Sequence, residues 1–251
     1  GAVQPSRLGQ SGNRAINRAI TQSTAQSFRL VADDNASVTS LELPGNQEFM
    51  LWPLTRQAAA LRMLAPNTHV QRVVLTNLSL GDDVAGVLAD VLRANTTLTS
   101  LNVEGNDLCE GGLCSIADAL TGNAALLELK LAHQKRQIPT SVEIALATAL
   151  ETNTTLLKLG FAPRFGEYER SISRSLARNG ELQRAELLRR AELELALEAS
   201  DWGRAAHLAA SEGDQQALRA RRLAVATAAA HAAAHAVAQE QAAKLIAERA
   251  G

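Results

Sequence analysis

One short phrase recurs along this chain at nearly constant spacing. An asparagine is followed by two small or polar residues and then by an aliphatic residue, and the best copies begin at Asn67, Asn95, Asn123 and Asn153. Neighbouring copies are 28, 28 and 30 residues apart. A fixed period of about 28 residues is the length of a repeat that contains one strand and one helix. The period therefore predicts a solenoid of stacked strand-helix units.

The unit that opens at Leu98 is the clearest. Leu98, Leu101 and Val103 are aliphatic residues at strand spacing, and Asn106 ends the run. This is the pattern of a leucine-rich repeat, in which aliphatic side chains enter the core and the asparagine binds backbone groups of the turn. An amphipathic helix is expected next, and Gly122-Asn123 suits a left-handed residue that ends it.

The same reading applies along most of the chain. We expect an α/β fold, namely a leucine-rich repeat solenoid of about five units with a parallel sheet and outer helices, followed by C-terminal α-helices. Because one repeat cannot bury its own apolar face, both ends need caps. The segment 13–32 is the expected N-terminal capping helix. A sixth candidate unit, with Leu182, Ala185 and Leu187, looks helical instead.

Composition changes after the repeats. From about Glu181 the chain is rich in Ala, Glu, Arg and Leu, which favour helices. We expect a helix to about Ala199, a short helix over 204–211 and a long helix over 215–249. Whether the long helix packs on the repeats, pairs with a second copy or binds a partner stays open, as does the oligomeric state. The expected domains are a segment with a capping helix (1–34), the repeat domain (35–180) and a helical extension (181–251).

Composition also limits the possible partners. A net charge of −1 does not favour nucleic acid, and no run of 18 uncharged apolar residues predicts a membrane-spanning helix. The start at Gly1 without a methionine is expected of a fragment or an expression remnant. A cytosolic protein is the simplest interpretation. Secretion stays open because four Asn-x-Ser/Thr triplets begin at Asn35, Asn77, Asn95 and Asn153.

Local motifs of catalysis are not evident. His231 and His235 lie four residues apart on the expected long helix, but no third metal ligand accompanies them. Cys109 and Cys114 do not have zinc-knuckle spacing, and we expect them to pack in the repeat. The glycines of the repeats are not followed by the Lys-Ser pair of a phosphate loop. We therefore expect no metal, no cofactor and no enzymatic activity.

Three stretches of the repeats have a distinctive sequence or length. They are Leu92–Asn106, the longer unit Leu126–Glu143 and Leu150–Phe161, and each resembles the corresponding part of tropomodulins and leiomodins. The resemblance covers roughly residues 14–190. Tropomodulins cap the pointed end of actin filaments, and their leucine-rich repeat domain is one of two actin-binding sites. The resemblance thus implies a protein-binding module that has actin as its partner and a cytoplasmic, cytoskeletal location.

Basic residues gather in the C-terminal repeats and after them. An acidic partner such as actin would face these cations, with exposed apolar residues nearby. The resemblance carries over Lys158 and Arg184 first, and Arg164 stands in Ala162-Pro163-Arg164 where the family has Gly-Pro-Arg. As solvated charges they would need no partner at all. The partner-binding candidates are Lys158, Arg184, Arg164, Lys135, Arg136, Arg189 and Arg190.

Two other functions fit the same fold. A generic leucine-rich repeat scaffold would bind another protein and not actin. A GTPase-activating repeat protein ranks third, since activators of a small nuclear GTPase share the period. Cosedimentation with actin filaments and acceleration of GTP hydrolysis separate the three.

Overall fold

The computed structural model describes residues 23–228. Contacts within the chain divide it into two compact units, with the boundary between Leu182 and Gln183. The first unit contains the repeats, and the described part of the second, residues 183–228, contains helices and no strand.

The first unit is built on one five-stranded parallel sheet. Each strand pairs in register with the next, so that Leu41, Val73, Leu101, Leu129 and Leu159 lie side by side. The strands follow the order of the sequence: β1 (Ser40–Glu42), β2 (Arg72–Val74), β3 (Ser100–Asn102), β4 (Glu128–Lys130) and β5 (Lys158–Gly160). The prediction of a parallel solenoid with about five strands is confirmed.

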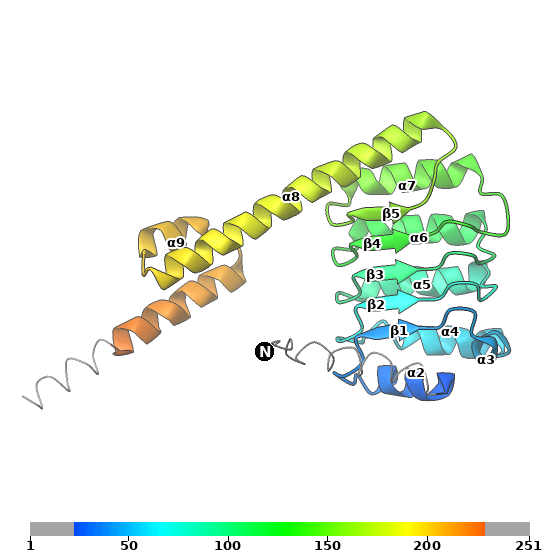
Figure 1. Cartoon of the computed structure of the whole chain (residues 1–251), viewed down its shortest axis with the longest axis horizontal. Helices are drawn as coiled ribbons and strands as arrows, with labels where there is room; N and C mark the ends of the chain where they lie inside the picture. The colour runs from blue at the N-terminus through cyan, green and yellow to red at the C-terminus, as the bar shows by residue number, and fades with distance from the viewer. Residues whose placement is uncertain (1–22, 229–251) are drawn as a thin grey trace, which may run out of the picture. The chain divides into compact units, whose positions relative to one another are not determined.

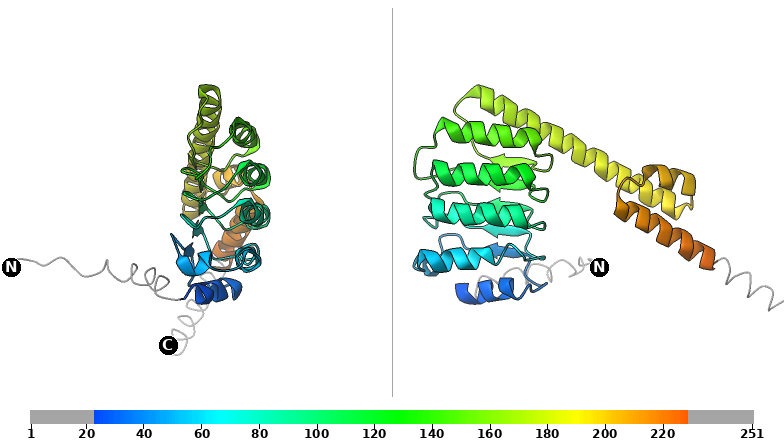
Figure 2. Two further views of the ribbon diagram at one scale, coloured as in Figure 1. Left: turned by 90° about the vertical axis from the view of Figure 1, so that its right-hand side faces the viewer. Right: turned by 180° about the vertical axis from the view of Figure 1, so that it is seen from behind.

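Parallel strands need a crossover connection, and helices supply it. Figures 1 and 2 show these helices stacked on one side of the sheet in the order of the strands. They are α4 (Leu54–Arg62), α5 (Asp82–Ala94), α6 (Glu110–Gly122) and α7 (Thr140–Thr152). Helices α2 (Thr24–Ala32) and α3 (Gln47–Met50) belong to the N-terminal end of the stack. The other side of β1 to β4 carries no described helix of this unit.

The expected inward-pointing residues form the core. Leu98, Leu101 and Val103 are buried, and their equivalents in the neighbouring repeats join them in one hydrophobic cluster. Asn106 is also fully buried. Its amide group donates to the Leu75 carbonyl at 2.7 Å, and its Oδ1 accepts from the Leu78 backbone at 2.9 Å. The structural role predicted for this asparagine is confirmed.

A second set of buried asparagines connects consecutive repeats. The amide group of Asn95 donates to the carbonyls of Leu64 and Asn67 at 2.7 and 2.8 Å, while its Oδ1 accepts from the backbone of Thr97 and Leu98 at 2.8 and 2.7 Å. Each of these side chains thus satisfies buried backbone groups of two repeats. Related bonds recur at every member of this set, which we call the asparagine ladder: Asn67, Asn95, Asn123, Asn153 and Asn179.

The ladder also explains how the helices end. Gly122 is the last residue of α6, and Asn123 after it is extended, with φ −80° and ψ 124°. The expected left-handed residue is therefore wrong at this position. A free carbonyl in the last turn of α6, that of Leu120, instead accepts from the Asn153 side chain at 2.8 Å. The amide of the following repeat replaces the left-handed cap.

The last helix of the repeats differs most from the expectation. A helix was expected from about Glu181, but α8 runs without a break over Gly166–Glu198. The earlier start has a physical cause. Asn179 lies inside α8 and still donates to the carbonyls of Asn153 and Leu156, and Ile172 joins the repeat core. A helix therefore takes the place of a sixth strand-helix unit and closes the stack.

The second unit has a small core of its own. It contains the end of α8, the helix α9 (Trp202–Leu208) and a helix that starts at residue 212 and is described as far as 228. The α9 helix starts two residues earlier than expected because Asp201 caps it by accepting from the Arg204 backbone at 3.1 Å. Helix 212–228 begins three residues before its expected start. The buried residues are Leu193, Ala196, Ala205, Ala209 and Leu218.

Some expectations fall outside residues 23–228. They are the first half of the expected capping helix, His231, His235 and the end of the expected long helix. The described part of the capping helix is α2, whose Phe28 packs against Phe49 with ring centroids 5.6 Å apart. Trp52 completes this aromatic cluster. The N-terminal end of the repeat core is thus covered by α2.

We expect Asn95→Ala to lower the free energy of unfolding by about 2–4 kcal/mol, because it leaves buried backbone groups of two repeats unpaired. Asn35→Ala is the matched control. Asn35 belongs to the same phrase but is half-buried, and its Oδ1 accepts only from Ser37. Its loss should be below about 1 kcal/mol. Urea unfolding followed by circular dichroism measures both, and equal losses would contradict the role of the ladder.

Candidate protein-binding surface

The side of the sheet that faces away from the helices presents two files of side chains. Because side chains alternate along a strand and the pairing is in register, every strand contributes its first and third residues to this side. One file contains Ser40, Arg72, Ser100, Glu128 and Lys158. The other contains Glu42, Val74, Asn102, Lys130 and Gly160. The surface is mostly polar.

Charges on this side concentrate at β4 and β5. The Oε1 atom of Glu128 lies 3.5 Å from Lys130 Nζ, and its Oε2 accepts from Ser100 Oγ at 3.1 Å. Burial by itself would raise the pKa of Glu128, but the hydrogen bond from Ser100 and the charges of Lys130 and Lys158 together lower it. Lys158 is exposed beside this carboxylate. Two lysines and one carboxylate leave this end of the sheet positively charged.

Lys135 and Arg136 lie together in the loop after β4. Lys135 Nζ is 2.6 Å from Ser79 Oγ, and Arg136 Nε is 3.1 Å from Asp107 Oδ1. Both side chains are exposed, so these contacts are easily exchanged for contacts with a partner.

Arg164, in the loop after β5, is tied more firmly. Its Nε lies 3.7 Å from Oε1 of Glu143, a carboxylate that is only 1% exposed, and its guanidinium also donates to the Ile138 carbonyl. Oε2 of Glu143 accepts from the Phe165 backbone at 3.3 Å. Arg164 therefore compensates a buried charge in addition to any contact with a partner.

Two apolar residues near Arg164 were not singled out by the sequence. Phe165 is 49% exposed, and its ring meets Tyr168 edge-on with centroids 6.3 Å apart. Ile144 on α7 is 46% exposed. Aromatic residues make up only 3% of the chain, and this scarcity was the one signal that could have directed attention to Phe165. Exposed aromatic residues beside cations are typical anchors of protein interfaces.

Arg178 was also missed. From α8 its guanidinium donates to the carbonyls of Leu150, Glu151 and Asn153 at 2.9, 2.9 and 2.7 Å. These groups lie at the C-terminal end of α7, where carbonyls lack helical partners. Arg178 is thus a cap for α7. The sequence around Arg178 gave no indication of this capping role, because the carbonyls that it binds lie 25 to 28 residues earlier in the chain.

Other kinds of site find little support. Within residues 23–228, no three His, Cys, Asp or Glu side chains are grouped so that they could hold a metal ion. Cys109 and Cys114 are half-buried and unpaired, and burial raises the pKa of Cys114. No helix of the described part is long and apolar enough to cross a membrane.

The repeats match one known family. The family described as the TMOD/LMOD leucine-rich domain matches residues 21–182. The chain belongs to the tropomodulin and leiomodin family. The family that the sequence resemblance predicted is thereby confirmed. The family domain ends where the first compact unit ends.

Curated and solved relatives agree with this assignment. Tropomodulin-4 of Bos taurus is 31% identical over 157 residues, which are 62% of this chain and 45% of that protein. Leiomodin-2 of Homo sapiens is 31% identical over 63% of this chain and 28% of its own length. The chain thus spans less than half of these relatives.

Two solved structures have the same fold. That of leiomodin-1 actin-binding site 2 is 28% identical with a TM-score of 0.64, covering 68% of this chain and 96% of that one. The tropomodulin C-terminal domain of Caenorhabditis elegans is 21% identical with a TM-score of 0.62, covering 66% and 99%. The second likeness shows the fold alone.

Three of the candidate cations lie beyond the family domain, in the second unit. Arg184 is exposed. Arg189 binds Glu186 at 2.7 Å and Asp214 at 2.9 Å, and it also donates to the Leu208 carbonyl. Arg190 Nε lies 2.7 Å from Glu186 Oε1. We call Arg189, Glu186 and Asp214 the arginine hub, which joins α8 to α9 and to helix 212–228.

The arginine hub makes the second unit sensitive to acid. Hydrogen bonds from Arg189 and Arg190 lower the pKa of Glu186 to about 2, and a bond from the Ser211 backbone lowers the pKa of Asp214. Both pKa values are lower in the folded chain than in the unfolded chain. The stabilisation is therefore fully present above the unfolded values and is lost as the pH falls through the folded values.

We expect the second unit to unfold progressively between about pH 4.5 and pH 2. Trp202 lies in this unit, so its fluorescence in a Trp52→Phe background reports the transition. Glu186→Gln should destabilise this unit at neutral pH and make its loss less dependent on pH. Glu194→Gln is the control, because it neutralises an exposed carboxylate on the same helix that lies outside the hub. A Glu186→Gln profile equal to that of the control would contradict the role of the hub.

Proposed function

We propose that the repeat domain of this chain binds actin filaments and caps their pointed end. The observation that carries the proposal is the likeness to leiomodin-1 actin-binding site 2, whose solved domain this chain covers almost completely. The family match over residues 21–182 supports the same function. Binding would occur in the cytoplasm, at the cytoskeleton, and by surface complementarity without catalysis.

We place the contact on the C-terminal repeats. Lys158, Lys135 and Arg136 are exposed, and each makes at most one contact with a neighbouring side chain that a partner could replace. Phe165, in the loop after β5, supplies exposed apolar area in the same repeats. Cations around apolar anchors suit an acidic partner, because the charges guide association while the anchors provide affinity.

The remaining cations contribute less to this surface. Arg164 compensates the buried Glu143, so its replacement would disturb the fold as well as binding. Arg189 and Arg190 are engaged with Glu186 in the second unit. We therefore expect Lys158 to be the most informative single position, since it is exposed and lies in a strand of the family domain.

A scaffold that binds a different protein is the second candidate. It is favoured by one observation, namely that residues 183–251 lie beyond the family domain. A chain with an added helical unit could have acquired another partner for the same repeat surface.

We expect the chain to slow pointed-end elongation of actin filaments whose other end is blocked, and to cosediment with filaments. Lys158→Glu should weaken both effects about tenfold or more, because it reverses a charge at the proposed contact. Raising the salt concentration should weaken binding in the same direction.

Arg62→Glu is the matched control for this experiment. Arg62 is an exposed cation on α4, on the helical side of the sheet, and its reversal should leave both effects unchanged. Cosedimentation without slower elongation would limit the function to filament binding. If neither effect is seen for the parent chain, the actin proposal is wrong and the scaffold becomes the better function.

A further inference from the structure

One face of α8 in the second unit is apolar and exposed. Leu188 and Leu195 are 66% and 64% exposed, although leucines that line one face of a helix usually pack against another element. Together with Arg184, Ala191 and Glu198 they are spaced four, three, four and three residues apart. This is the spacing of the contact positions in a pair of supercoiled helices. We call these five residues the α8 seam.

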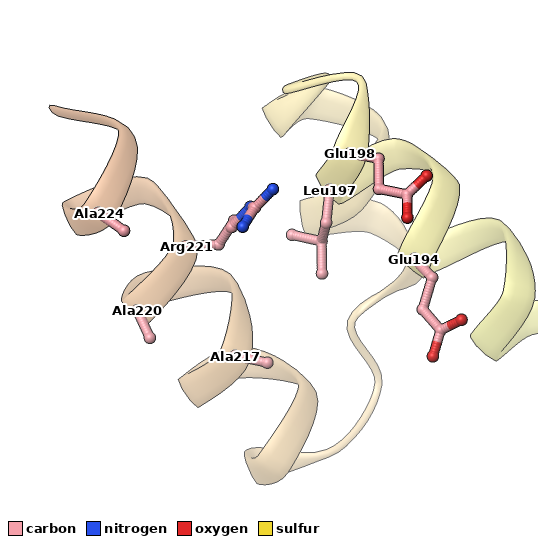
Figure 3. A pocket seen from close by; sticks show the side chains of 7 residues that line it. All are labelled: Glu194, Leu197, Glu198, Ala217, Ala220, Arg221 and Ala224. Carbon is pink, nitrogen blue, oxygen red and sulfur yellow. The ribbon is translucent and has the colours of Figure 1, made fainter. Parts of the chain in front are cut away.

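Most of the α8 seam faces away from the core of its unit. Leu193 and Ala196, which pack against α9 and helix 212–228, lie on the other side of α8 at about 100° per residue. Figure 3 shows the groove between α8 and helix 212–228, which is lined by Leu197, Arg221 and three alanines and also by Glu194 and Glu198. In this view the carboxylates of Glu194 and Glu198 turn away from helix 212–228. The small core of the unit thus leaves the first four seam residues uncovered, while Glu198 is exposed at the edge of the groove.

We propose that the α8 seam pairs antiparallel with the seam of a second copy of this chain. The seam is nearly self-complementary about Ala191: Arg184 and Glu198 lie seven residues before and after it, and Leu188 and Leu195 lie three before and four after it. In an antiparallel pair centred there, the two Ala191 residues meet at the twofold axis, and Leu188 of each copy lies within one residue of direct opposition to Leu195 of the other. Arg184 of each copy then meets Glu198 of the other. A parallel pair would instead place Arg184 against Arg184 and Glu198 against Glu198.

The position of Glu198 favours the same arrangement. It is the last residue of α8, where the helix dipole disfavours a carboxylate, and the last turn contains no basic residue. Neither Arg184 nor Glu198 makes an ion pair or a side-chain hydrogen bond within the described part of the chain. An arginine from the second copy would compensate both the carboxylate and the end of the helix. Leucine at the inner positions and opposite charges at the outer ones are what a short antiparallel pair requires.

Charge reversal tests the pairing directly. The mass of the full chain in sedimentation equilibrium should rise with concentration toward twice 26.6 kDa. Arg184→Glu and Glu198→Arg should each be monomeric, because each places like charges together. An equimolar mixture of these two variants should recover the dimer, since every outer position then has an opposite charge. The double variant Arg184→Glu/Glu198→Arg should recover it as well.

A crosslink tests the register. Ala191→Cys should form a disulfide between copies on mild oxidation, because the twofold axis brings the two positions 191 together. Ala185→Cys, also exposed on α8 but away from the seam, is the control, and the parent chain shows any contribution of Cys109 and Cys114. A monomeric parent at every concentration would overturn the proposal. A dimer that withstands both reversals, or one that Ala185→Cys crosslinks equally well, would also overturn it.

The pairing is independent of the proposed function, and the two can fail separately. Lys158→Glu should lose filament binding and retain the dimer mass. Glu198→Arg should lose the dimer and retain filament binding. If Arg184→Glu instead loses filament binding and remains dimeric, the position belongs to the actin surface and the pairing proposal is wrong.

Discussion

The repeat domain depends on hydrogen bonds between consecutive repeats, made by buried asparagines. A single strand-helix unit has only three strand residues and one helix, and it leaves carbonyls at the end of the helix without partners. Each asparagine of the ladder supplies donors for those carbonyls and acceptors for the backbone that leads into the next strand. Because the bonds cross from one repeat to the next, the units are stable only as a stack.

This dependence explains why the fold could be predicted from the sequence. The asparagines and the aliphatic residues after them recur at one period, and burial requires the same residue types in every unit. The inward-pointing residues, the parallel order and the role of Asn106 all follow from that period. The end of α6 did not follow, because the partner of the Leu120 carbonyl is Asn153, 33 residues away. Sequence rules for helix ends consider only neighbouring residues, so they cannot predict a hydrogen bond from another repeat.

The end of the repeats was predicted less well for a related reason. The phrase at Asn179 has the wording of a repeat boundary, yet it lies in the middle of α8. What decides the structure is that the amide of Asn179 and the guanidinium of Arg178 both donate to carbonyls between α7 and β5, those of Asn153 and Leu156. No sixth strand is needed to satisfy those carbonyls. A helix that carries these two donors can therefore close the core. The phrase at Asn179 did not predict that this helix starts at Gly166.

The candidate surface shows a similar division between what residue types indicate and what only contacts decide. The sequence placed basic residues in the C-terminal repeats and after them, but it could not distinguish cations that compensate a carboxylate from cations that are free. Arg164 faces the buried Glu143, and Arg189 joins three helices, so their charges are already used within the chain. Lys158 and Arg184 carry the same positive charge and remain exposed. Which cations are available to a partner is thus set by where the chain needs charge compensation, and this depends on residues distant in sequence.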